Sequence, residues 1–112
     1  MKPKRMPIPH HYVYVIELDP AVLTNRHFRE ANPGYRPGGL CVYVGMTGLD
    51  PTIRFENHRR GHKPSRIVKR FGLRLREDFY RGLNPMRFEV ACRKEQALAL
   101  ELRAQGLGVW QK

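Results

Sequence analysis

Two short runs of β-branched and aromatic residues lie in the first half of the chain. Residues 12–16 read Tyr-Val-Tyr-Val-Ile, and residues 40–44 read Leu-Cys-Val-Tyr-Val. Such side chains are enriched in strands, and an uninterrupted run is typical of a strand covered on both faces. We therefore expect two buried strands. The connection over residues 20–39 is long, with two Pro-Gly turn signals, and a short helix is expected within residues 20–31.

Helix boundary signals follow the second run. Asp50 suits the N-cap position, and Pro51 suits the first helical position. Gly61 is placed to end the helix, so we expect a helix over residues 51–60. Apolar residues at helical spacing, each time followed by a glycine, predict two more helices, over residues 65–71 and 94–105.

A third strand is predicted over residues 86–92, where apolar and polar side chains alternate. The order is then ββααβα, and the expected fold is a small α/β (α+β) domain with a three-stranded, antiparallel-type sheet flanked by helices. Cys41 and Cys92 each fall inside an expected strand, where a thiol acts as a small apolar side chain. We expect no disulfide and no zinc site.

Length and charge narrow the possible functions. A chain of 112 residues has room for one domain, which is expected to span residues 1–112 after a basic, Pro-rich lead-in over residues 1–9. The 21 Lys and Arg against 10 Asp and Glu give a net charge of +11, which favours a polyanionic partner. The chain holds no apolar run of the roughly 20 residues that span a bilayer, so nucleic acid is favoured over a membrane. The lead-in does not resemble a signal peptide, and we expect a cytoplasmic protein.

The region from residue 57 to residue 76 contains no acidic side chain. A solvated face normally mixes charges of both signs, so a run of one sign is better explained by contacts to phosphates. Phosphate contacts position a protein without reading sequence. The predicted nucleic-acid-binding residues are Arg59, Arg60, Lys63, Arg66, Lys69, Arg70, Arg74 and Arg76.

One acidic residue falls on the expected apolar face of the last helix. A helical wheel places Glu101 between Ala97 and Leu98, so it is expected to face inward. An inward carboxylate loses hydration and stays charged only where a cation, a metal or several donors compensate it. The residues leave three alternatives open, namely a functional site, a structural pairing with an arginine, and a position that only borders the apolar stripe beside Gln105.

Four further side chains are candidates for chemistry. Arg54 and His58 stand four residues apart and share one helix face, which suits a phosphate, although a solvated surface pair has the same spacing. Tyr14 and Tyr43 occupy matching places in the two strands and could face one cleft, or could be packing residues. A tyrosine acts as a base only if a cation or metal lowers its pKa from about 10.

Taken in order, these segments resemble the GIY-YIG nuclease superfamily. Residues 12–14 resemble its first signature, and residues 43–45 resemble its second. Arg54 and His58 then follow at the spacing typical of that family, and Glu101 resembles its metal-binding glutamate. The resemblance covers residues 12–105 and is most specific from Tyr43 to His58.

The resemblance implies a divalent-metal-dependent endonuclease that hydrolyses phosphodiester bonds, in DNA rather than RNA. Glu101 would bind one Mg²⁺ or Mn²⁺ ion, Arg54 would clamp the phosphate and His58 would help orient it. Tyr14 or Tyr43 would accept the proton of the attacking water. Gly45, without a side chain, would let the backbone approach the substrate.

Two departures from the family pattern keep alternatives open. Tyr12 stands where the family usually has glycine, and the connection between the strands is long enough to form a lid over the substrate. A non-catalytic DNA- or RNA-binding module of the same fold and a small ribosome-associated protein are the competing hypotheses. No added domain would select a target, so a partner protein supplying specificity is also possible.

Overall fold

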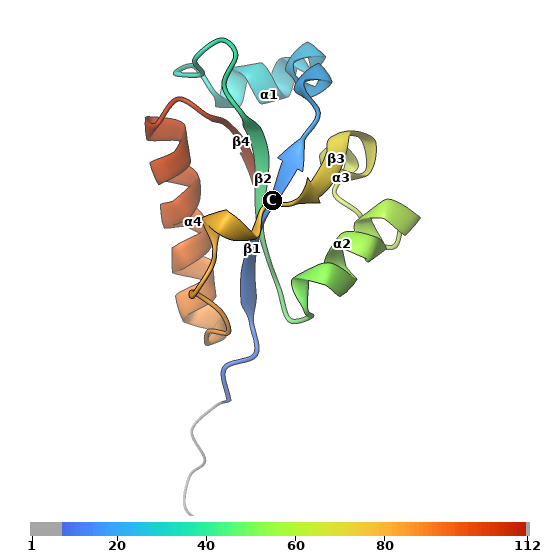
Figure 1. The fold of residues 1–112 in the computed structure, drawn as a ribbon, viewed down its shortest axis with the longest axis vertical. Coiled ribbons are helices and arrows are strands. Elements are labelled where there is room, and N and C mark those ends of the chain that lie inside the picture. The colour runs from blue at the N-terminus through green and yellow to red at the C-terminus, as the bar shows by residue number, and fades with distance from the viewer. Residues whose placement is uncertain (1–7, 112) are drawn as a thin grey trace, which may run out of the picture.

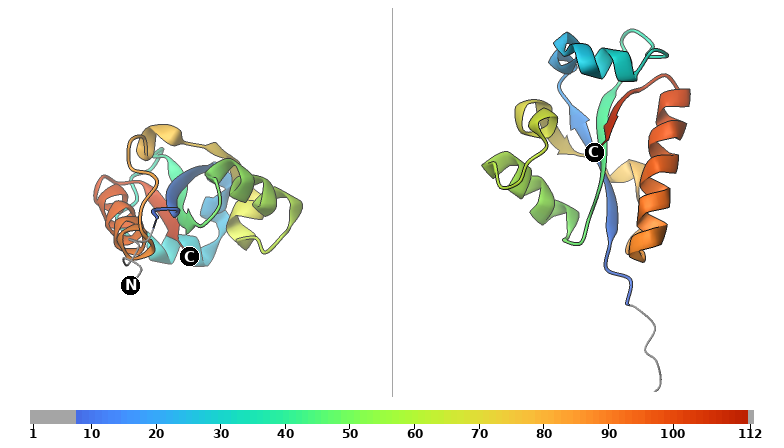
Figure 2. Two further views of the ribbon diagram at one scale, coloured as in Figure 1. Left: turned by 90° about the horizontal axis from the view of Figure 1, so that it is seen from below. Right: turned by 180° about the vertical axis from the view of Figure 1, so that it is seen from behind.

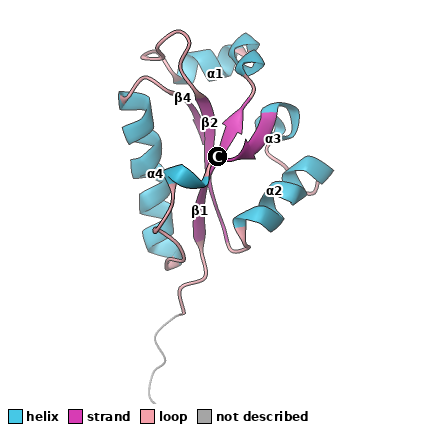
Figure 3. Ribbon diagram, in the orientation of Figure 1, coloured by secondary structure: helices cyan, strands magenta, loops and turns pink. Residues whose placement is uncertain are grey.

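The computed structural model describes residues 8–111, so the predicted lead-in lies outside the described residues except for its last two. The chain folds into a four-stranded sheet flanked by helices (Figures 1 and 3). The strands are β1 (Tyr12–Leu18), β2 (Cys41–Thr47), β3 (Gly72–Leu75) and β4 (Gly108–Gln111). The helices are α1 (Arg26–Ala31), α2 (Pro51–Arg60), α3 (Arg66–Phe71) and α4 (Phe88–Ala104), with 3-10 turns η1 (Pro20–Thr24) and η2 (Glu77–Phe79).

The sheet has the strand order β3-β1-β2-β4 and is mixed. β1 pairs antiparallel with both β2 and β3, whereas β2 pairs parallel with β4. The prediction of a three-stranded antiparallel sheet is therefore wrong in two respects. The sheet has four strands, and its edge strand β4 pairs in parallel with β2. Four residues directly after a helix carry too little periodicity to mark a strand from sequence.

The expected third strand over residues 86–92 is also wrong, because Phe88 begins α4. The third strand is instead Gly72–Leu75, within a stretch that carries no clear periodicity. Phe88 and Val90 are exposed while Ala91 is fully buried, so the apparent alternation is the first turn of a helix. Cys92 consequently lies on α4, with its Sγ 3.6 Å from the Met46 sulfur.

Several local predictions are confirmed, whereas the helix predicted over residues 94–105 begins earlier, at Phe88. Strands cover both apolar runs, and a helix spans residues 51–60. The Asp50 side chain accepts a hydrogen bond from the Thr52 N–H, and Gly61 closes α2 at a φ of 80°. Ser65 caps α3, which runs from Arg66 to Phe71, and Cys41 is buried inside β2 as expected.

The helices form a layer on each face of the sheet. α4 packs on β2 and β4, whereas α2 and α3 pack on β1 and β3, on the other side (Figures 1 and 2). The apolar side chains of the strands fill the space between these layers and form the core. No helix within residues 8–111 is long and apolar enough to cross a membrane.

The long connection between β1 and β2 belongs to the core. Val22 and Phe28 within it are fully buried. The Asn32 side chain accepts a hydrogen bond from the Val109 N–H at 2.8 Å and donates one to the Val109 carbonyl at 3.0 Å, which joins α1 to β4. These contacts hold the connection against the sheet, in disagreement with a lid over the substrate.

Candidate active site

A cavity of about 480 Å³ opens beside β2, at the end of this strand that does not pair with β4. β4 pairs with β2 only from Cys41 to Val44, which leaves the edge at Gly45–Thr47 without a paired strand within the described residues. No residue of the connection between β1 and β2 lines this cavity. The lining residues are His11, Tyr14, Tyr43, Met46, Thr47, Gly48, Arg54, Phe88, Cys92, Glu95, Gln96 and Gln111.

Tyr14 and Tyr43 lie together at the base of this cavity. In the antiparallel register Tyr14 is opposite Gly45 and Tyr43 is opposite Ile16, so both rings project from the same sheet face. Their ring centroids are 6.1 Å apart. The two tyrosines therefore line one cleft, which is one of the two alternatives that the strand pattern left open, and both are almost completely buried.

The space for these rings depends on Gly45. A Cβ atom at this position would lie 2.7 Å from Cε1 of Tyr43 and 2.8 Å from both Cζ and the hydroxyl oxygen of Tyr14. Real Cβ atoms do not approach other atoms so closely. Gly45 is itself buried, so its requirement is explained by room for the two phenol rings rather than by contact with a substrate backbone.

His58 holds Tyr14 from the other side. The Ser65 N–H donates to Nδ1 of His58 at 3.0 Å, which leaves the ring hydrogen of the neutral imidazole on Nε2. Nε2 lies 3.0 Å from the Tyr14 hydroxyl oxygen, and on this assignment it donates to that oxygen. Burial and then the Arg54 charge lower the pKa of His58 to about 4, so the ring is neutral at physiological pH. His58 is thus not a solvated surface residue.

The two phenols are held in their protonated state by their surroundings. Burial raises the pKa of Tyr14 well above its ordinary value, and the neighbouring Tyr43 raises it further. Burial also raises the pKa of Tyr43, whereas its hydrogen-bond interaction with Tyr14 acts in the opposite direction. The positive charge of Arg54 lowers the pKa of both. Additional positive charge in the cavity is needed before either phenol ionises near neutral pH.

Arg54 reaches the cavity from α2 and is fixed by the loop that follows the helix. Its guanidinium donates to the backbone carbonyls of His62 at 3.3 Å and Lys63 at 2.7 Å. A guanidinium carries five N–H donors in a planar fork that matches phosphate and carboxylate groups. Arg54 and His58 share one face of α2 as predicted, and Arg54 lines the cavity.

The expectation that Glu101 faces inward is wrong, because Glu101 is exposed and does not line the cavity. The acidic residue that does so is Glu95, which is 9 % exposed and lies six residues earlier on α4. At helical geometry six residues separate two side chains by about 120° around the axis and about 9 Å along it. The negative charge of Glu95 acts on Tyr43, which places the two groups near one another.

His11 is a cavity residue that the sequence did not single out. Its backbone pairs with Met86 in an isolated bridge, with hydrogen bonds of 2.9 and 2.8 Å, and its ring lies between His10 and Phe88. Nδ1 of His11 is buried and has no hydrogen-bond partner among residues 8–111. Two adjacent histidines before a strand carry no signal for this position, because the pairing with Met86 arises only in the folded chain.

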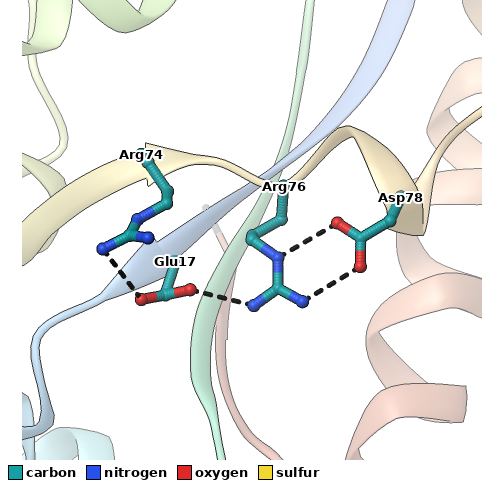
Figure 4. A network of polar contacts seen from close by, with 4 residues as sticks. All are labelled: Glu17, Arg74, Arg76 and Asp78. Atoms are coloured by element: carbon teal, nitrogen blue, oxygen red, sulfur yellow. Dashed lines mark hydrogen bonds and ion pairs between the residues drawn. The ribbon is translucent and has the colours of Figure 1, made fainter.

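The predicted basic surface is divided by the fold. Six of its residues are exposed on α2, α3 and the loop between them, namely Arg59, Arg60, Lys63, Arg66, Lys69 and Arg70. Arg76 instead donates to Glu17 at 2.9 Å and to Asp78 at 3.0 Å, and the Arg74 guanidinium lies 3.8 Å from Glu17 (Figure 4). The Arg76 guanidinium is thus engaged by two carboxylates, so we expect it to stabilise the fold rather than to bind phosphate.

The donor set of the cavity limits the metal that it suits. No group of three or more His, Cys, Asp or Glu side chains is gathered to hold a metal within residues 8–111. Glu95 is the carboxylate among the lining residues, which supply phenol and amide oxygens from Tyr14, Tyr43, Gln96 and Gln111 and also include His11, Met46 and Cys92. Mg²⁺ is commonly held by one or two carboxylates together with water and substrate phosphate oxygens. This lining fits a hard, oxygen-seeking divalent cation of that kind.

The chain was compared with family models, with curated proteins and with solved structures. None of these three comparisons gives a significant match.

Proposed function

We propose that this protein is a divalent-metal-dependent endonuclease that hydrolyses phosphodiester bonds in nucleic acid, and in DNA rather than RNA. The observation that carries this proposal is the convergence of Tyr14, Tyr43, Arg54 and Glu95 on one cavity from β1, β2, α2 and α4. The proposed relationship to the GIY-YIG nucleases rests on the same residues, with Glu95 in place of Glu101 as the metal ligand.

Each side chain has a role that follows from its surroundings. Arg54, held by two backbone carbonyls, binds a non-bridging oxygen of the phosphate that enters the cavity. The Tyr14 and Tyr43 pair takes the proton of the attacking water once one of the phenols is ionised. The Nε2 hydrogen of His58 and the charge of Arg54 both stabilise that phenolate.

Glu95 is the residue proposed to hold Mg²⁺ or Mn²⁺. When bound, such a cation supplies the positive charge that stabilises the phosphorus-centred transition state and the leaving oxygen. The attack forms a bond between the water oxygen and phosphorus and breaks the bond to the leaving oxygen. The exposed arginines and lysines of α2 and α3 hold the flanking backbone.

Nicking of supercoiled plasmid DNA in Mg²⁺ or Mn²⁺ tests the proposal. Glu95→Gln keeps the size of the side chain but removes its charge, so we expect loss of nicking with DNA binding in EDTA unchanged. Glu101→Gln is the matched control, because it makes the same change at an exposed position of the same helix. Unchanged nicking by Glu95→Gln would overturn the assignment, and the absence of nicking in the unmodified protein on DNA and RNA substrates would favour a binding module.

A further inference from the structure

A second cavity, of about 260 Å³, is lined by Tyr12, which lies on the same face of β1 as Tyr14. Tyr12, which lines it, pairs in the sheet register with Thr47, which lines the first cavity. Asp50 also lines the second cavity and lies one turn before Arg54 at the start of α2. Neighbouring strands are about 4.8 Å apart and a helical turn rises about 5.4 Å. Residues that line the two cavities are therefore neighbours both in the sheet and on α2, which suits adjacent nucleotides of one strand.

The most unusual group in this second cavity is the Tyr80 hydroxyl. Tyr80 is only 8 % exposed, and its hydroxyl oxygen is buried without a hydrogen-bond partner among the described residues. Such groups are rare in folded proteins and call for a ligand or a functional reason. Burial, followed by the charges of Glu77 and Asp50, raises the pKa of Tyr80 to about 12. Tyr80, Glu77 and Asp50 line the same cavity, and the Tyr80 hydroxyl makes no hydrogen bond to either carboxylate.

The lining chemistry selects among possible occupants. Glu77 and Asp50 offer hydrogen-bond acceptors, Tyr12 and Tyr80 offer aromatic rings, and Arg81 lies at the same cavity. Asp50 already serves as the cap of α2, so Glu77 is the carboxylate at this cavity that is available to read N–H groups. Carboxylates accept hydrogen bonds from the amino group of cytosine. Thymine carries an oxygen in the corresponding position, which carboxylates repel.

We propose that this second cavity binds the base of an unpaired nucleotide beside the bond that is cut, and that Glu77 and Tyr80 make it prefer bases that carry an amino group. This inference rests on the proposed function, since it places the phosphate of the same strand in the first cavity. The base must be unpaired because a whole base can enter a cavity only after it has left the duplex stack. Single-stranded or branched nucleic acid is the substrate class that follows.

Two oligonucleotides of equal size and charge test the preference. Fluorescein-labelled (dC)₁₀ and (dT)₁₀ differ in whether each base offers an amino group or a carbonyl. Binding is measured by anisotropy in EDTA at one salt concentration, where no cutting occurs. We expect about fivefold or greater preference for (dC)₁₀, in line with the discrimination given by one base contact.

The variants are chosen to preserve the fold. Tyr80→Phe removes only an oxygen without a partner among the described residues, and Glu77→Gln removes only a charge on an exposed residue. In each variant the ratio of the affinity for (dC)₁₀ to that for (dT)₁₀ should fall toward one. The thermal unfolding temperature should be unchanged. Glu101→Gln should keep the full preference. Asp50 is left intact because it caps α2.

The outcomes separate this inference from the proposed nuclease activity. Equal binding of the two oligonucleotides by the unmodified protein, or a preference that survives both variants, would overturn the base-binding cavity even if nicking depends on Glu95. A preference that is lost in both variants supports the cavity, whatever the result of the nicking assay.

Discussion

The hydroxyl oxygen of Tyr14 lies 3.0 Å from Nε2 of His58, which joins the first strand to α2 across 44 residues of chain. The other ring nitrogen of His58 accepts the backbone N–H of Ser65, so both nitrogens are used. A fully buried imidazole that makes two such bonds fixes the orientation of the tyrosine it contacts. The position of the Tyr14 phenol therefore depends on a neutral His58.

Lowering the pH should weaken the fold through His58. Its pKa is lowered to about 4, so between its ordinary value of 6.5 and pH 4 the unfolded chain binds the proton and the folded chain does not. Stability is then complete above pH 6.5 and falls as the pH drops toward 4, by at most on the order of 3 kcal/mol. Urea unfolding at several pH values measures this loss. His58→Gln should show a smaller loss over the same window, and an identical loss would contradict the assignment.

Replacement of Gly45 by alanine should damage the site more than the fold. The added methyl group meets both phenol rings at less than 3 Å, so the rings must move. Overpacking of this kind costs about 1–3 kcal/mol. We expect this loss in urea unfolding together with loss of nicking. Val44→Ala, a change in the same strand, provides the comparison, and nicking that persists in Gly45→Ala would show that the ring positions are not critical.

The sequence predicts this fold best where local chemistry decides the structure. The two apolar strands and α2 follow from β-branched residues and from Asp50 and Gly61, which act through their nearest neighbours. β4 was missed because it is short and exists through parallel pairing with β2 and through Asn32, far away in the chain. Such long-range pairing leaves no local pattern.

The candidate site could also be predicted only as far as local sequence signals place its elements. Tyr14, Tyr43, Arg54 and His58 lie on elements whose bounds were predicted, and they come together as expected. A helical wheel over residues 94–105 leaves out Ala91 and favours Glu101, whereas α4 begins six residues earlier, at Phe88. The buried residues of the full helix are Ala91, Glu95, Leu98, Ala99 and Leu102. With these as the inward face, Glu95 is central and would have been the acidic candidate.

The basic surface should be separable from the structural arginines by its response to salt. Each phosphate contact contributes about one to the slope of log affinity against log salt. Arg66→Ala with Arg70→Ala should therefore weaken DNA binding and reduce the slope by about two. Arg76→Ala removes the same charge from a guanidinium paired with Glu17 and Asp78, so it should leave the slope unchanged and lower stability instead. Equal slopes for both variants would contradict this division.

The two tyrosines should respond differently to removal of their hydroxyl groups. Tyr14→Phe leaves the buried Nε2 hydrogen of His58 without its acceptor, which costs about 1–3 kcal/mol, whereas no histidine bond is lost in Tyr43→Phe. Because the pair shares the proton-accepting role, each variant should lower nicking by about 10²–10⁴-fold. Urea unfolding and plasmid nicking, measured on the same preparations, separate the effect of each variant on stability from its effect on catalysis. Tyr43→Phe should be inactive yet stable, and full activity of Tyr43→Phe would assign the base to Tyr14 alone.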